Sequence, residues 1–182
     1  MARRSTRPAP PRRSPRRRGL GAPERPAGTA RTYTSPPVAI DFAGAGHRFD
    51  RADLEIRGIY HGEASYEGRV FLNNPKADAG TPRTPEQGYA GSFHIFGHGG
   101  CFGDVGHCEV AEHDREHDDR RAPHPLTPAN KRLTVTEPLQ RAAAAGDSVT
   151  VTIVPVVTAA NELCDTTDVF RFESMRFVTY DP

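Results

Sequence analysis

The chain has 182 residues, which is enough for one domain with a real hydrophobic core and a tail. Hydrophobic residues make up 36% of the chain, and its 17 prolines and 17 glycines predict many turns. No stretch is apolar enough for a membrane-spanning helix or for the hydrophobic part of a signal peptide. We therefore expect no membrane association and a cytoplasmic location, with secretion alongside a partner left open.

The net charge of +1 conceals two unlike parts of the chain. Residues 1–31 hold ten arginines and one acid, so this part carries +9, and the remaining 14 basic and 22 acidic residues carry −8. Residues 1–36 are rich in Arg, Pro, Ser and Ala and offer almost nothing to bury, which predicts a disordered tail. Clustered arginines attract phosphate backbones, so a nucleic-acid-associated protein is one functional alternative. We do not expect nucleic acid as the partner, because no aromatic residues interleave the arginines and no folded basic module accompanies them.

Beyond the tail, the pattern changes to short runs of alternating apolar and polar residues separated by turns. In residues 52–60, Leu54 and Ile56 fall on one side and charged residues on the other, which predicts a half-buried strand. Further strands are predicted over residues 65–72, 89–96, 131–136, 148–157 and 169–178, with a long surface loop over residues 75–88.

One short helix is predicted after the fourth strand. Thr136 is expected as its N-cap, Pro138 lies in its first turn, and Gly146 is expected to end it in a left-handed conformation. Six short strands and one helix indicate an all-β domain over residues 37–182, an antiparallel β-sandwich or jelly-roll-like fold.

The segment from Gly91 to Cys108 is the strongest functional candidate in the sequence. It carries three of the eight histidines and two of the three cysteines among many glycines. Imidazole and thiolate groups are ligands that copper and zinc prefer, so one interpretation is a site for Cu(I) or Zn(II). Its predicted ligands are His94, His98, Cys101, His107 and Cys108.

A structural interpretation of the same segment stays open beside the metal site. In it, Cys101 and Cys108 form a disulfide that closes a short loop and stabilises it by roughly 2–3 kcal/mol. Cys164 could also pair with either of them. Phe102, between the two cysteines, is either an apolar plug that faces a partner or an aromatic residue that packs back on its own domain.

An ordered set of motifs resembles a known family. Arg69-Val-Phe-Leu-Asn73, Ala90-Gly-Ser-Phe93, the short helix and Val151-Thr-Ile-Val-Pro155 follow one another in the order and approximate spacing of one particular domain. This is the C-terminal β-sandwich domain of tyrosinases, polyphenol oxidases and haemocyanins, the type-3 copper proteins. The resemblance covers roughly residues 38–180.

The resemblance implies a domain that is itself non-catalytic. In that family, the domain packs over a helical bundle that holds two copper ions on six histidines, and it shields the entrance to the copper site. The sequence pattern shows no such bundle, so we expect no phenol oxidation by this chain alone. The resemblance predicts a lid or copper-assisting accessory domain, whose partner is a tyrosinase-like catalytic domain in another polypeptide or in a lost upstream region. An independent Cu(I)- or Zn(II)-binding protein is the alternative.

Overall fold

The structure is a computed structural model, and it describes residues 30–40, 49–99, 126–159 and 166–180. Within these residues the chain forms antiparallel strands, one α-helix and one short 3-10 helix. In chain order the elements are β1 (Tyr33–Thr34), β2 (Val38–Ala39), β3 (Arg51–Ile59), β4 (Ser65–Leu72), η1 (Pro85–Gln87), β5 (Tyr89–Ile95), β6 (Ala129–Thr134), α1 (Thr136–Ala145), β7 (Ser148–Val149), β8 (Val151–Ala159) and β9 (Ser174–Tyr180).

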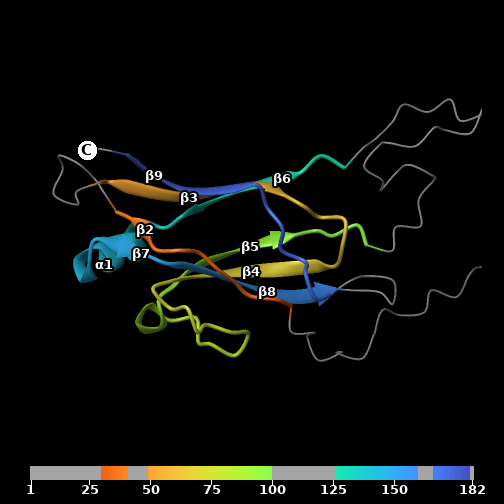
Figure 1. Ribbon diagram of the computed structural model, residues 1–182, viewed down its shortest axis with the longest axis horizontal. Helices are drawn as coiled ribbons and strands as arrows, with labels where there is room; N and C mark the ends of the chain where they lie inside the picture. The colour runs from red at the N-terminus through yellow and green to blue at the C-terminus, as the bar shows by residue number, and fades with distance from the viewer. Residues whose placement is uncertain (1–29, 41–48, 100–125, 160–165, 181–182) are drawn as a thin grey trace, which may run out of the picture.

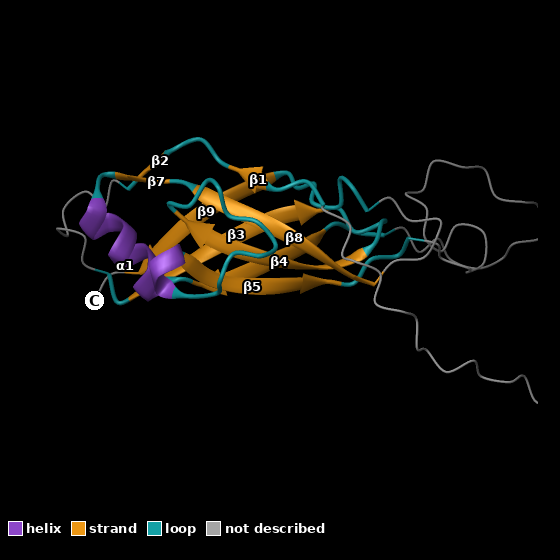
Figure 2. Ribbon diagram, turned by 90° about the horizontal axis from the view of Figure 1, so that it is seen from below, coloured by secondary structure: helices purple, strands orange, loops and turns teal. Residues whose placement is uncertain are grey.

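Two antiparallel sheets stack as the layers of a sandwich (Figures 1 and 2). One sheet has the strand order β1-β8-β4-β5 and the other has the order β6-β3-β9, while β2 and β7 form a separate pair. The single described α-helix lies at one end of the sandwich (Figure 1). The predicted all-β class and antiparallel sandwich are therefore confirmed. In the part of the chain that the structure describes, no helix has the length and apolar character needed to cross a bilayer.

The core lies between the two sheets. Because side chains alternate across a strand, every second residue of each central strand points into it. Its largest fully buried side chains include Leu54 and Ile56 of β3, Tyr66 and Val70 of β4, and Ile153 of β8. These residues come from both sheets, so burial of their apolar surface holds the two layers together.

The three strand motifs of the family resemblance lie in adjacent strands, β8, β4 and β5, of one sheet. Gly68 of β4 lies opposite Phe93 of β5, and an added Cβ at Gly68 would overlap the Phe93 ring. The missing side chain therefore makes room for Phe93 in the core, where its ring centroid lies 6.3 Å from that of Tyr66 and 6.0 Å from that of Phe170.

The prediction of a half-buried β3 was wrong, because both faces of the strand are buried. Asp53 and Glu55 point away from the core, yet they are 0% and 5% exposed. Arg132 of β6 and Arg176 of β9 lie opposite Glu55, and their side chains pair with its carboxylate. Arg51 and Arg57 of β3 itself also pair with Asp53 and Glu55, so arginines from all three strands of this sheet cover the acids. The alternation within β3 does not reveal this cover.

The helix forms where it was predicted, but its two ends differ from the prediction. Val135 is the N-cap, and Thr136 is the first helical residue. The hydroxyl of Thr136 instead accepts a hydrogen bond from the amide of Ala52 in β3, at 3.0 Å. Gly146 has a φ of 166°, which is extended backbone rather than a left-handed cap.

The described fold begins before residue 37, where the tail was expected to end. Ala30 is buried, Tyr33 pairs with Ile153 of β8, and the hydroxyl of Ser35 accepts a hydrogen bond from the amide of Val151 at 2.9 Å. Residues 30–36 are therefore part of the sandwich.

Candidate functional site

The candidate site lies at the end of the sandwich opposite α1, where the β3–β4 loop meets the residues that follow β5 (Figure 1). We call this the histidine end and define it as residues 60–65 and 96–99. The register of the antiparallel β4–β5 pair sets Tyr66 opposite Ile95. Residues just before Tyr66 and just after Ile95 are consequently brought side by side.

Backbone hydrogen bonds fix residues 97–99 on the neighbouring loop. Their three amides donate, in chain order, to Ser65 Oγ, to the His61 carbonyl oxygen and to the Glu63 carbonyl oxygen, each at 2.9 Å. The chain passes so close at Gly97 that an added Cβ would overlap the Glu63 carbonyl oxygen. Glycine is needed here because two backbone segments touch.

The side chains of His61 and His98 meet where these two backbone segments are held together. Nδ1 of His61 lies 3.1 Å from Nδ1 of His98, and Nε2 of His61 lies 2.8 Å from the carbonyl oxygen of Thr127. A carbonyl oxygen only accepts, so the Nε2 of His61 carries a proton and donates it. In neutral His61, the Nδ1 lone pair then accepts from the Nδ1–H of His98. The imidazole of His61 is thus oriented by one bond and presents a lone pair through the other nitrogen.

Phe96 stands directly beside this pair and faces solvent. Its side chain is 77% exposed, against 39% for Val38 and 39% for Tyr180, the other large hydrophobic residues that the structure shows exposed. The Phe96 ring meets the His98 ring edge to face, with centroids 5.4 Å apart. Because residues 97–99 are hydrogen-bonded to the β3–β4 loop, the backbone next to the exposed Phe96 ring is held in place.

Of the predicted metal ligands, the structure describes His94 and His98. His98 contacts His61, a residue that was not among the predicted ligands, whereas His94 lies on β5, exposed and opposite Glu67 of β4. The other predicted site residues lie outside the described residues, and their metal, disulfide and plug roles stay predictions: Cys101, Phe102, His107 and Cys108. Among the described residues, no group of three or more His, Cys, Asp or Glu side chains could hold a metal ion.

The carboxylate nearest His94 in the register is already engaged. Arg69 Nε donates to Glu67 Oε2 at 3.0 Å, and Arg83 Nη2 donates to the same oxygen at 2.8 Å. Burial raises the pKa of Glu67, but hydrogen bonds from Arg69 and Ser92, together with the charges of Arg69 and Arg83, bring the pKa below its ordinary value. Glu67 is therefore an arginine-paired structural carboxylate, which leaves His94 as a single exposed imidazole.

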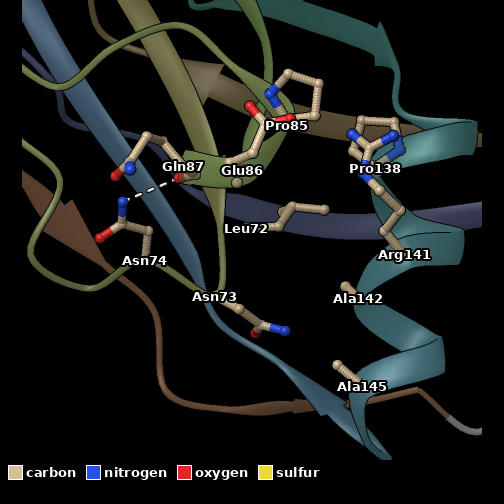
Figure 3. Close-up of a pocket in the computed structure, with 11 residues that line it drawn as sticks. Leu72, Asn73, Asn74, Pro85, Glu86, Gln87, Pro138, Arg141, Ala142 and Ala145 are labelled. Atoms are coloured by element: carbon tan, nitrogen blue, oxygen red, sulfur yellow. Dashed lines mark hydrogen bonds between the residues drawn. The ribbon is translucent and has the colours of Figure 1, made fainter.

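A second candidate is a groove at the opposite end of the sandwich, between α1 and the loop that follows β4. Its volume is about 410 Å³, and Figure 3 shows the residues that line it. Leu72, Pro138 and Ala142 contribute apolar walls. Glu86 and Arg141 are its charged lining residues, so the lining offers neither a nucleophile with a base nor a metal-ligand set. The groove is a weaker functional candidate than the histidine end.

Fold and site together define a small antiparallel β-sandwich that presents an exposed aromatic residue and a histidine pair at one end. No protein-family profile matches the chain, and no curated protein matches its sequence. A comparison with solved structures does find similar chains. Latent aurone synthase (polyphenol oxidase) from natural source matches with a TM-score of 0.45 and 16% identity over 86% of this chain and 25% of that chain. The recombinantly expressed latent enzyme matches with a TM-score of 0.45 and 19% identity over 85% of this chain and 26% of that chain. The chain thus spans about a quarter of the length of the structures that it matches.

Proposed function

We propose that the chain is an accessory β-sandwich domain that docks through its histidine end on the catalytic domain of a tyrosinase-like copper oxidase. The observation that carries the proposal is Phe96, a phenylalanine left 77% exposed on a hydrogen-bonded base at the end of a sandwich. Aromatic anchors at fixed positions are the side chains that contribute most to protein–protein interfaces.

The family motifs support the choice of partner. They lie in β8, β4 and β5, and β5 leads directly into Phe96. The sequence resemblance thus covers the sheet that presents the exposed ring, and it implies a type-3 copper catalytic domain as the surface that receives it.

A docking role suits the described residues better than a copper-oxidase reaction within this chain. A type-3 centre needs six histidines around two copper ions, and the described residues contain His61, His94 and His98, with no group of three ligands brought together. The described part of the chain does not fit that centre, so we assign it no step in phenol oxidation.

Mixing the chain with a tyrosinase-like catalytic domain that lacks its own C-terminal domain tests this function. We expect a stable complex by gel filtration and a lower rate of oxidation of a bulky phenol, because the docked domain covers the substrate entrance. The Phe96→Ala variant should weaken the complex by roughly tenfold or more, as expected for loss of an aromatic anchor.

Tyr180→Ala provides the matched control, because Tyr180 is also a partly exposed aromatic residue but lies at the C-terminal end of β9, away from the histidine end. This variant should bind like the wild type. Absence of a complex together with an unchanged oxidation rate would rule out the accessory role, and equal weakening by both variants would rule out Phe96 as the anchor.

A further inference from the structure

We propose that His61 and His98 form a two-imidazole binding site for a divalent transition metal, with Cu(II) the preferred ion. The site differs from the predicted ligand set in the Gly91–Cys108 segment, because it uses His61 and leaves His94 out. It is also independent of the docking role, since it concerns a metal bound by this chain alone.

The imidazole of His61 already has the tautomer of a metal ligand. Metal-binding histidines almost always donate their other ring N–H to a carbonyl or carboxylate oxygen, which fixes the tautomer and turns the free lone pair towards the metal. His61 has this arrangement, with Nε2 donating to the carbonyl oxygen of Thr127 at 2.8 Å and Nδ1 left as the lone-pair nitrogen.

The separation of the two nitrogens is also close to what a shared metal ion requires. The Nδ1 atoms of His61 and His98 lie 3.1 Å apart. A zinc or copper ion about 2.05 Å from each nitrogen would make an N–metal–N angle of about 100° at this separation, and an ideal tetrahedral angle needs a separation of about 3.3 Å. The two nitrogens therefore need to part by only about 0.2 Å, and the rings must also turn so that each Nδ1 lone pair points at the ion and not at the other ring.

Binding requires one tautomer change and no net release of a proton. The neutral His98 that donates from Nδ1 has its lone pair on Nε2. When Nδ1 becomes a ligand, the proton leaves Nδ1 and a solvent proton is taken up at Nε2, so the ring stays neutral. Both rings are partly exposed, so water can fill the remaining coordination positions.

The ligand chemistry selects the ion. Imidazole suits copper, zinc and nickel, and among first-row divalent ions Cu(II) binds a given nitrogen site most tightly. A bound ion also joins the β3–β4 loop to the segment that follows β5, so metal binding should raise the stability of the histidine end.

The test titrates CuSO4, with glycine as a competing chelator, into the full chain carrying Cys101→Ser, Cys108→Ser and Cys164→Ser, because free thiols reduce Cu(II). We expect one equivalent to bind with the electron paramagnetic resonance signature of two imidazole nitrogens. His61→Ala and His98→Ala should each weaken binding by roughly tenfold or more, since loss of a ligand costs at least as much as loss of its outer-shell partner.

His94→Ala is the matched control, because it removes an exposed imidazole of β5 that lies outside the pair. It should leave the affinity unchanged. A second measurement uses protein that keeps all its histidines. In it, one equivalent of Cu(II) should broaden the NMR resonances of His61 and His98 before those of His94. Equal copper affinity with and without His61, a signature of fewer than two imidazoles, or broadening centred on His94 would each overturn the proposal.

Discussion

Glu55 of β3 and Arg176 of β9 are paired across the sheet, with Arg176 Nε donating to Glu55 Oε2 at 2.9 Å. Arg132 pairs with the same carboxylate from β6, on the other side of β3. The hydrogen bonds from Arg176 and Arg132 outweigh the effect of burial and lower the pKa of Glu55 to about 2. A single carboxylate therefore ties the three strands of this sheet together on its outer face.

This pairing predicts a pH-dependent contribution to stability. The folded-state pKa of about 2 lies below the ordinary pKa of about 4.3 for an unfolded glutamate, so the contribution is fully present above that ordinary value. It declines as the pH falls from about 5 towards 2. Glu55→Gln should therefore lower the urea midpoint at pH 7, and the gap between variant and wild type should narrow at pH 3.

Asp168→Asn serves as the control for this measurement, because Asp168 is an exposed carboxylate outside the strands. Its midpoint should follow that of the wild type at every pH. A gap between Glu55→Gln and wild type that stays constant from pH 7 to pH 3 would show that the carboxylate charge contributes nothing.

The sequence predicted elements whose pattern is local. The period-two alternation over residues 65–72 predicted β4 with its observed bounds, and the alanine-rich run before Gly146 predicted α1. The strand predicted over residues 169–178 begins later, at Ser174, and Phe170 and Phe172 stack on each other near the core. Alternation of apolar residues in the sequence does not distinguish a strand of the sheet from aromatic residues that stack on each other near the core.

Features that depend on register could not be predicted. Burial of Glu55 follows from which arginines lie opposite it in β6 and β9, and the sequence does not state that pairing. The register that sets Tyr66 opposite Ile95 brings the β3–β4 loop to the residues that follow β5, but continued past the strand ends it would place Glu63 opposite His98. The contact of His61 with His98 depends on how that loop turns, which the pattern of the two strands does not state.

The hydroxyl of Thr136 is predicted to stabilise the junction of α1 with β3. It accepts from the amide of Ala52, a residue that is 0% exposed. Thr136→Val keeps the shape but leaves that buried amide without its partner, which should cost about 1–3 kcal/mol of unfolding free energy. Chemical denaturation should show this loss, whereas Thr136→Ser, which retains the hydroxyl, should lose clearly less; equal losses would show that the methyl packing matters and the bond does not.

Gly97 is predicted to be required for the geometry of the histidine end. An alanine there must push residues 96–99 away from the Glu63 carbonyl oxygen, so Gly97→Ala should cost about 1–3 kcal/mol and remove the contact between His61 and His98. Hydrogen exchange of the His98 amide, which donates to the His61 carbonyl, should become faster.

The control for Gly97 is Gly146→Ala, where an added Cβ meets nothing within 4 Å and the backbone is extended. That substitution should change stability by less than about 1 kcal/mol and is expected to stabilise if anything, since alanine restricts the unfolded chain. If the His98 amide of Gly97→Ala exchanged at the wild-type rate, this would contradict the close approach of the two backbone segments at Gly97.

Two deletions test whether the folded part of the chain begins at residue 30 or at residue 37. Removing residues 1–29 leaves every described contact in place. Removing residues 1–36 also removes β1, the hydrogen bond between Ser35 and Val151, and the edge-to-face contact between Tyr33 and Phe172, whose ring centroids lie 4.9 Å apart. Because one buried hydrogen bond and one aromatic pair each contribute roughly 1 kcal/mol, the longer deletion should lose about 2 kcal/mol or more relative to the shorter one. Thermal unfolding of the two purified deletions measures the difference, and equal midpoints would mean that β1 contributes nothing to the sandwich.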